Sequence, residues 1–251
     1  MKSKSFIVSA HQPNFMPYLG FFDKMQKSNI FVIRDEVLFV KKEFHNRNKI
    51  RINSHDNLSS PKCKWLNVPV TNYNDYILHV LIKKDAEHKN KLWHENILHD
   101  LKSNYKHTPY FDDFFPKLEE IFKNSNGSLI SLNMKIINFL KESFKIKTKI
   151  VFASELGLKP IHYQKSDASE DLANICKVLN ADTYLSGSAG KNYLNREPFT
   201  KADIKLEFQE YNHPTYRQNY PEFLFNMSAI DTLFCIGKMP ATKKQLILSN
   251  S

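Results

Sequence analysis

The sequence predicts an α/β fold, built on a mostly parallel, Rossmann-like sheet with flanking helices and a helical insertion. Two short apolar runs near the N-terminus, residues 6–8 and 30–33, flank a segment whose apolar residues have helical spacing. The first run leads into His11 and the second ends before Asp35. A strand–helix–strand unit of this length is typical of a parallel sheet with a right-handed crossover. A second strand–helix–strand pattern at residues 149–186 repeats this order.

The length and composition favour one folded unit. The chain has 251 residues, of which 41% are hydrophobic and 25% charged, and this is enough to bury a sizeable core. No internal repeat or linker interrupts it. We therefore expect a single α/β domain over residues 1–251, with a helical insertion or subdomain at about 88–146.

The N-terminal elements follow from apolar spacing. Residues 5–10 and 29–34 are predicted strands, and residues 17–28 form a predicted helix with Pro17 in its first turn. Residues 37–52 alternate roughly, which predicts a strand or hairpin lined with Lys and Arg. Further strands are expected at residues 64–70, where Pro69 marks an edge or an end, and at residues 77–84.

The remaining elements alternate again after a helical stretch. Three apolar stripes within residues 89–144 predict helices separated at Thr108-Pro109 and Asn126-Gly127. A strand at 149–154, a helix at 169–179 and a strand at 204–208 follow. A short helix over residues 228–234 is predicted to stop at Gly237.

Charge and cysteine usage narrow the class of partner. The net charge of +10 favours an anionic partner, although a basic surface without one partner is equally compatible. Nucleic acid fits this charge but is not favoured, because the lysines are spread along the chain. The three distant cysteines and the lack of CxxC or HExxH predict neither disulfides nor a metal site. No apolar run suits a signal peptide or a stable membrane insertion, so we expect a cytoplasmic protein.

Candidate site residues lie where predicted strands end, since ligands of open α/β sheets bind at the carboxyl ends of strands. His11, followed by Gln12, is suited to general-base chemistry or to binding phosphate. Asp35 is suited to a ribose hydroxyl, an amine or a metal. Local hydrogen bonding and a solvated turn are the plainer alternatives for these positions.

Two further segments carry polar candidates. Lys41, Asn46 and Arg47 combine phosphate-binding cations with an amide, although such a cluster is usually a solvated face. The small-residue loop at Ser186, Gly187, Ser188 and Gly190 could place backbone N–H groups around a phosphate. It matches neither GxxxxGK[ST] nor GxSxG, and a tight turn is the alternative.

These pieces recur together in a known pattern that runs from about residue 11 to residue 237. The N-terminal matches are His11-Gln12-Pro13, Pro17, Gly20, Phe21, Phe22, Asp23-Lys24, Phe31-Val32, Asp35, Phe39, Lys41, Asn46-Arg47, Ile50, Trp65-Leu66 and Pro69-Val70. The C-terminal matches are Tyr184-Leu185-Ser186-Gly187, Gly190, Tyr193-Leu194, Pro214, Tyr216, Gln218, Ser228, Ile230-Asp231, Leu233-Phe234 and Gly237. In these residues the chain resembles the WbqC-like protein family.

The chain departs from the family pattern at three positions. Leu38 stands where Gln is usual and Phe44 where Trp is usual, and Glu43 often corresponds to Gly. Leu38 removes one polar contact, whereas Phe44 keeps the aromatic bulk. The resemblance implies a bacterial protein of O-antigen or other surface-polysaccharide biosynthesis.

Joining that pathway to the residues gives a hypothesis. An acyl or aminoacyl group would be transferred to the amine of a nucleotide-linked aminosugar, with His11 as the base. Asp35 or Asp231 would orient the base or the sugar, and Lys41 and Arg47 would hold phosphate. The resemblance adds Tyr193, Tyr216 and Gln218 as further substrate-binding candidates.

Several alternatives stay open. The enzyme would be a transferase or an ATP-dependent amide-forming ligase, and ATP or an activated acyl donor would be its co-substrate. A non-catalytic nucleotide-sugar-binding or scaffolding protein, and an RNA-binding protein that uses tRNA, are the other classes. The oligomeric state is also open.

Overall fold

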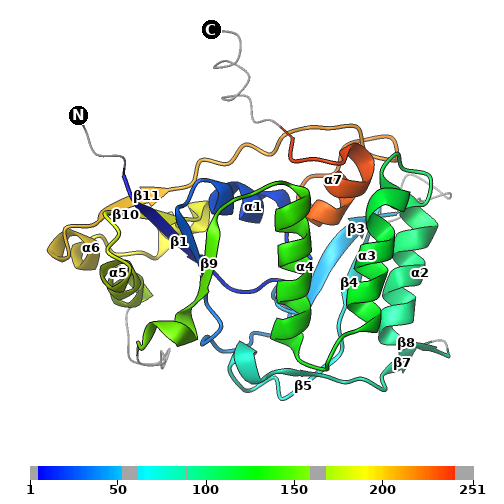
Figure 1. The fold of residues 1–251 in the computed structure, drawn as a ribbon, viewed down its shortest axis with the longest axis horizontal. Helices are drawn as coiled ribbons and strands as arrows, with labels where there is room; N and C mark the ends of the chain where they lie inside the picture. Colours follow the sequence, from blue (N-terminus) through cyan, green and yellow to red (C-terminus); the bar gives the residue numbers. More distant parts are fainter. Residues whose placement is uncertain (1–4, 53–61, 89, 159–167, 241–251) are drawn as a thin grey trace, which may run out of the picture.

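A five-stranded parallel sheet organises the chain, as the computed structural model shows for residues 5–52, 62–88, 90–158 and 168–240. Its strands lie side by side in the order β9-β2-β1-β10-β11 (Figure 1). Their bounds are β1 Ile7–His11, β2 Ile30–Ile33, β9 Lys149–Phe152, β10 Thr183–Ser186 and β11 Lys205–Phe208. Numbered by their order along the chain, the strands run 3-2-1-4-5, which is the Rossmann arrangement. The predicted α/β class is confirmed.

Helices cover both faces of this sheet because its apolar residues alternate between two cores. Val8 and Val32 pack with α5 (Ala168–Val178) and with Phe199 of α6 (Glu197–Lys201). Phe31 and Ile33, one position out of phase with Val32, pack in the other core with α1 (Leu19–Gln26). β2, which lies between β1 and β9 and is covered on both faces, is apolar throughout, whereas the edge strands β9 and β11 also carry charged residues.

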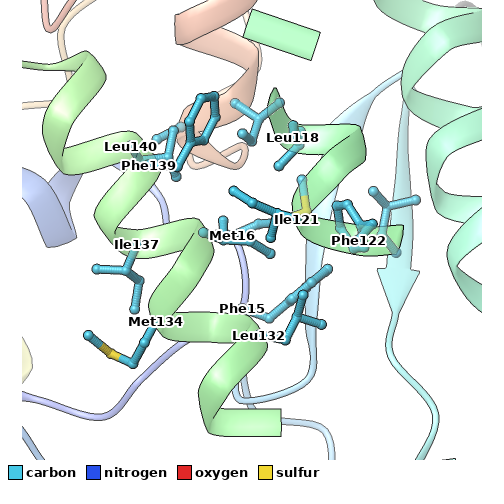
Figure 2. Packing of buried hydrophobic residues seen from close by; sticks show 14 of the residues in the cluster. Phe15, Met16, Leu118, Ile121, Phe122, Leu132, Met134, Ile137, Phe139 and Leu140 are labelled. Atoms are coloured by element: carbon cyan, nitrogen blue, oxygen red, sulfur yellow. The ribbon is translucent and has the colours of Figure 1, made fainter. Parts of the chain in front are cut away.

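The long connection between β2 and β9 holds the helical region. It contains α2 (Trp93–Tyr105), α3 (Phe111–Lys123) and α4 (Leu129–Ser143), all within the predicted helical stretch. Figure 1 shows α2 and α3 at the opposite end of the molecule from α5 and α6. Figure 2 shows the core there, where Phe15 and Met16 lie between apolar side chains of α3 and α4.

Three short antiparallel strand pairs complete this connection. β3 (Arg47–Arg51) and β4 (Cys63–Asn67) form an antiparallel ribbon. Pro69 separates β4 from β5 (Val70–Thr71), which pairs with β6 (Leu81–Ile82). β7 (Glu87–His88) pairs with β8 (Lys91–Leu92).

One predicted strand is wrong. Residues 77–84 form a short 3₁₀ helix, η1 (Ile77–His79), followed by β6. The Ile77 amide donates to the Val37 carbonyl at 2.9 Å, and the Ile82 amide donates to that of Gly127 at 2.7 Å. These tertiary hydrogen bonds bend a segment whose apolar run alone reads as extended.

The C-terminal helix is as predicted. α7 (Ala229–Ile236) begins after Ser228, whose side chain accepts a hydrogen bond from the Ile230 amide at 3.3 Å. It ends at Gly237, which has a left-handed φ of 69°. α7 contacts α2, α3, α4 and β3, so the last helix of the described residues packs on the helical region rather than on the sheet (Figure 1).

Candidate active site at the carboxyl ends of β1 and β10

The pocket that best matches the sequence predictions lies where the strand order reverses. From β1 the chain continues to β2, whereas from β10 it continues to β11 on the opposite side. At such a switch point the loops diverge and leave a crevice. The pocket has a volume of about 420 Å³ and is lined by His11, Gln12, Arg34 and the loop Ser186–Gly190. Its other lining residues are Ala10, Tyr18, Lys24, Val37, Ala168, Leu172, Tyr184 and Tyr193.

Lys24 is a buried cation in the wall of this pocket. It lies on α1, its exposed fraction is 4%, and its Nζ donates to the Ala10 carbonyl at 2.9 Å. Burial lowers the pKa of Lys24 to about 7, because the charged amine is taken out of water. The pocket therefore contains an amine that is poised between its charged and neutral forms at neutral pH.

Arg34 is the second buried cation of the pocket. It directly follows β2, and its Nε donates to Glu36 Oε1 at 2.5 Å. Burial raises the pKa of Glu36, against the opposing effect of Arg34. The two Nη groups of Arg34 make no hydrogen bond to any described residue, so the fork that binds phosphate is held at its base and open at its tip.

His11 is a neutral imidazole, and one of its two ring nitrogens already has a hydrogen-bond partner in the protein. Its Nδ1 lies 3.0 Å from the Gln12 carbonyl, which can only accept, so Nδ1 carries the proton and Nε2 a lone pair. Burial, followed by the nearby charge of Lys24, lowers the pKa of His11 to about 3. His11 is thus an acceptor at neutral pH.

Gln12 is oriented by a buried histidine. His45 accepts the Val40 amide at Nδ1 (3.2 Å), so its Nε2 is the donor to Gln12 Oε1 at 3.0 Å. Burial lowers the pKa of His45 to about 4, which keeps this tautomer neutral. The Gln12 amide NH₂ makes no hydrogen bond to the described residues and can donate to a ligand.

The small-residue loop forms the opposite wall. It leads into η3 (Ser188–Asn192), and the Gly190 amide donates to the Gly187 carbonyl at 3.0 Å. A Cβ on Gly190 would collide with Ser186 Oγ and lie 3.0 Å from Leu194 Cδ1, whereas one on Gly187 would lie 3.9 Å from Lys24 Nζ. Glycine is therefore required by packing at position 190, and at position 187 it keeps space beside the buried amine.

The pocket is electropositive. No Asp or Glu lines it within the parts of the chain that the structure describes. Of the nearby carboxylates, Glu36 pairs with Nε of the pocket cation Arg34, and Asp23 accepts from Lys27 and Gln209, both at 2.7 Å. Two buried cations, a donor amide and a neutral imidazole suit an anionic ligand.

The two predicted carboxylates lie outside this lining. Asp35 accepts from the Ser154 amide (3.1 Å) and from its hydroxyl (2.6 Å), which joins β2 to the turn after β9. Arg34 lines the switch-point pocket, whereas Asp35 lines a different cavity with Leu78 and Phe152. Asp231 is fully buried on α7, where burial raises its pKa to about 7 against the effect of Arg51.

The predicted residues on and beside the ribbon also have other partners. Lys41 Nζ lies over the ring of Tyr73, and the Arg47 guanidinium lies over Trp65. The Asn46 side chain donates to the Val68 carbonyl at 2.8 Å. None of the three lines the switch-point pocket.

Tyr216 and Gln218 belong to the segment before α7. The Gln218 side chain makes two hydrogen bonds with the backbone of Leu224, at 2.8 and 3.0 Å, and Tyr216 packs against the helical core. Of the predicted residues, the structure thus brings together His11, Gln12, Tyr193 and the four named loop residues.

Lys24 and Arg34 are the pocket cations that the sequence reasoning did not assign to the site. The sequence could have identified Lys24 as a site residue, because it falls with Phe21 and Met25 on the apolar stripe of a helix, where a lysine is unusual. Arg34 and Asp35 both come just after a buried strand, and the sequence does not show which of them enters the pocket. The backbone turn after β2, where the Asp35 amide donates to the Ile33 carbonyl, decides between them.

Metal and membrane features are as follows. The described ranges contain no group of three or more His, Cys, Asp or Glu side chains placed to hold a metal ion. Of the helices within those ranges, none has the length and apolar character that crossing a bilayer demands.

Comparison with known proteins gives the family. The sequence profile of the WbqC-like protein family matches residues 12–242. A relative described as "Uncharacterized protein Rv1507c", from Mycobacterium tuberculosis (strain ATCC 25618 / H37Rv), is 25% identical over 236 residues, which cover 92% of this chain and 94% of that protein. No solved structure matches the chain. Because the match spans both walls of the pocket and nearly the whole chain, the protein belongs to the WbqC-like protein family.

Proposed function

We propose that this protein transfers an acyl or aminoacyl group to the amine of a nucleotide-linked aminosugar, in bacterial surface-polysaccharide (O-antigen) biosynthesis. The observation that carries the proposal is the pair of buried cations, Lys24 and Arg34, in the wall of a switch-point pocket without lining carboxylates. Such a pocket is suited to the diphosphate of a nucleotide-linked substrate.

Phosphate binding would change the protonation of the site. A dianionic group beside Lys24 and His11 favours their charged forms, so their pKa values rise from about 7 and about 3 when the ligand binds. At pH 7 Lys24 then takes up a proton, whereas His11, whose pKa rises from about 3, stays neutral and can still accept one. Affinity for the anion therefore falls as the pH rises above 7, where the free protein has lost the Lys24 charge.

His11 is suited to the transfer step. The sugar amine attacks the carbonyl carbon of the activated acyl donor, a C–N bond forms, and the bond from carbonyl carbon to leaving group breaks. The proton released by the amine passes to His11 Nε2 and then to the leaving group. The bound phosphate supports this role, because it raises the basicity of an imidazole that is otherwise weakly basic.

Ligand binding is tested by thermal unfolding. A panel of UDP-, dTDP-, GDP- and CMP-linked sugars, with ATP as a further arm, should contain a compound that raises Tm by roughly 5–10 °C at 100 times its Kd. Arg34→Lys keeps the charge but loses the fork, and should weaken that compound about tenfold or more. Arg196→Lys, on the surface near α6, is the matched control. A panel without any stabilising compound would contradict the proposal.

Transfer is tested separately with the stabilising nucleotide-sugar. Incubation with ATP plus a carboxylic acid, or with an acyl thioester, should add the acyl mass to the aminosugar, as read by mass spectrometry. His11→Ala should lower the rate about 100-fold or more while leaving sugar binding within a few-fold. If His11→Ala turns over at the wild-type rate, its role as base is excluded.

A further inference from the structure

A basic and aromatic surface lies outside the pocket just described, on the ribbon β3–β4. Lys49 and Trp65 are directly opposite each other in the antiparallel register, so their side chains share one face. Arg47 is two residues away on the same strand and also shares it. We call this set, together with Phe44, the ribbon surface.

Cations and exposed rings alternate on the ribbon surface. The Arg47 guanidinium lies 4.2 Å from the centroid of the Trp65 ring, and Lys49 Nζ lies 5.7 Å from it. Phe44 approaches the same ring at 5.8 Å between centroids. Both Trp65 and Phe44 are 38% exposed, so large apolar rings are kept in water beside positive charge.

The charge of this surface is not neutralised by the protein. Residues 38–51 contain five cations and one carboxylate, Glu43. Within the described ranges, neither Lys49 nor Arg47 forms an ion pair, and Arg47 Nη donates only to the Lys42 carbonyl. Nearby, Lys41 Nζ lies 4.1 Å from the ring centroid of Tyr73, another exposed aromatic residue.

A pocket adjoins the ribbon surface at Trp65. It has a volume of about 720 Å³ between β4 and α2, and both tryptophans of the chain, Trp65 and Trp93, line it. Lys64, Lys91 and the imidazoles of His88 and His99 add polar and basic lining. Two acidic residues, Glu87 and Asp100, also line it, and Asp100 is paired with Lys64 at 2.7 Å.

We propose that the ribbon surface binds single-stranded nucleic acid, with one base stacked at Trp65 and a neighbouring nucleotide in the adjoining pocket. Every base has a face that can stack on an aromatic ring, and the phosphates between bases meet the cations that flank that ring. Polyphosphate would use the cations but not the exposed rings. This proposal is independent of the function assigned to the switch-point pocket.

Trp65 supplies a direct readout. In a Trp93→Phe variant it is the remaining tryptophan, and base stacking should quench its fluorescence. The probes are rU12, dT12, a 12-base-pair duplex and polyphosphate of matched charge. The single strands should quench and bind more tightly than the duplex. Binding of rU12 alone assigns RNA, and binding of both strands assigns single strands of either sugar.

Side-chain variants separate stacking from charge. Trp65→Leu should weaken binding about tenfold or more, while Trp65→Phe should retain most of it. Arg47→Ala/Lys49→Ala should lower the slope of log K against log salt by roughly 1.4, at about 0.7 for each phosphate contact in a single strand. Lys41→Gln/Lys49→Gln is the second variant if the first fails to fold. Lys201→Ala/Lys205→Ala removes two exposed cations near β11 and should change neither the affinity for the single strands nor the salt slope.

Four results would overturn the proposal. They are the lack of Trp65 quenching by both single strands, equal binding of polyphosphate, tighter binding of the duplex, and unchanged binding by Trp65→Leu. Equal binding of polyphosphate would show anion attraction without stacking. Circular dichroism and Tm of each variant establish that any loss of binding occurs in folded protein.

Discussion

At the scale of single residues, the switch-point pocket depends on groups that cost stability. Lys24 is held as a buried amine whose hydrogen bond to the Ala10 carbonyl does not replace its hydration. Burial of such a group is the pattern expected where function, not folding, selects the residue. A substitution of Lys24 should therefore separate its effect on stability from its effect on ligand binding.

Lys24→Met should stabilise the fold and abolish anion binding. The folded-state pKa of Lys24 lies below its unfolded value, so the cost of burying its charge is full below pH 7 and is lost as pH rises toward 10.5. The variant should therefore gain roughly 2–4 kcal/mol at pH 6, and less at pH 9. Urea unfolding at both pH values measures this. A variant that is less stable than wild type at pH 6 would show that the amine stabilises the fold.

The two loop glycines form a matched pair. Gly187→Ala adds a methyl group 3.9 Å from Lys24 Nζ without a clash, so Tm should change little while affinity for an anionic ligand falls. Gly190→Ala meets Ser186 Oγ and Leu194 Cδ1 and should cost about 1–3 kcal/mol of stability. Thermal unfolding with and without ligand measures both. A larger loss of Tm for Gly187→Ala than for Gly190→Ala would contradict the packing described for this loop.

At the scale of elements, the end of α7 combines two constraints on one glycine. Gly237 has a φ of 69°, and a Cβ there would lie 2.6 Å from the Tyr110 ring. The Tyr110 amide in turn donates to the Phe234 carbonyl at 3.1 Å, so this end of the helix is joined to the start of α3.

Gly237→Ala should destabilise the protein more than Gly157→Ala. Gly157 has nearly the same φ, 68°, but no atom of the described residues lies within 4 Å of the added Cβ. Its substitution measures backbone strain alone, about 1 kcal/mol. The difference between the two free energies of unfolding, expected to be about 1–3 kcal/mol, reports the ring contact. Equal losses would mean that the Tyr110 ring moves aside without cost.

At the scale of the whole molecule, a second buried charge lies away from the switch-point pocket. Neither carboxylate oxygen of Asp231 has a hydrogen-bond partner among the described residues, and Arg51 Nε and Nη1 likewise have none. Arg51 Nη2 donates to the Pro221 and Glu222 carbonyls, which ties the segment before α7 to β3. Helix, ribbon and connecting segment therefore meet around an incompletely compensated pair.

Asp231→Asn should make the global stability less sensitive to pH. The folded-state pKa of Asp231 is raised to about 7, so its ionisation costs stability progressively from pH 4 to 7 and fully above pH 7. The variant should match wild type near pH 4 and be roughly 2–4 kcal/mol more stable at pH 8. The difference in free energy of unfolding between variant and wild type removes the contribution of the histidines, which titrate in both proteins. A variant less stable at pH 8 would mean that the Arg51 pairing outweighs desolvation.

The sequence determined the elements of the sheet and one side of the pocket. Apolar residues that are continuous or alternate with polar ones predicted β1, β2, β9 and β11, and Gly237 predicted the end of α7. These signals are local in the sequence, so they can be read without the tertiary structure. His11 and Gln12 could be placed at a strand end for the same reason. The family pattern linked them to the loop at Ser186–Gly190 before any contact between them was known.

Tertiary structure alone decided which side chains share the pocket. Arg34 and Asp35 are adjacent in sequence, and the backbone turn after β2 places one in the pocket and the other against Ser154. Lys41 and Arg47 have the right chemistry for phosphate but lie outside the switch-point pocket, beside exposed aromatic rings. Residue type and spacing along the chain specify the strands, whereas the neighbours of a side chain depend on strand order and register, which join segments more than 150 residues apart.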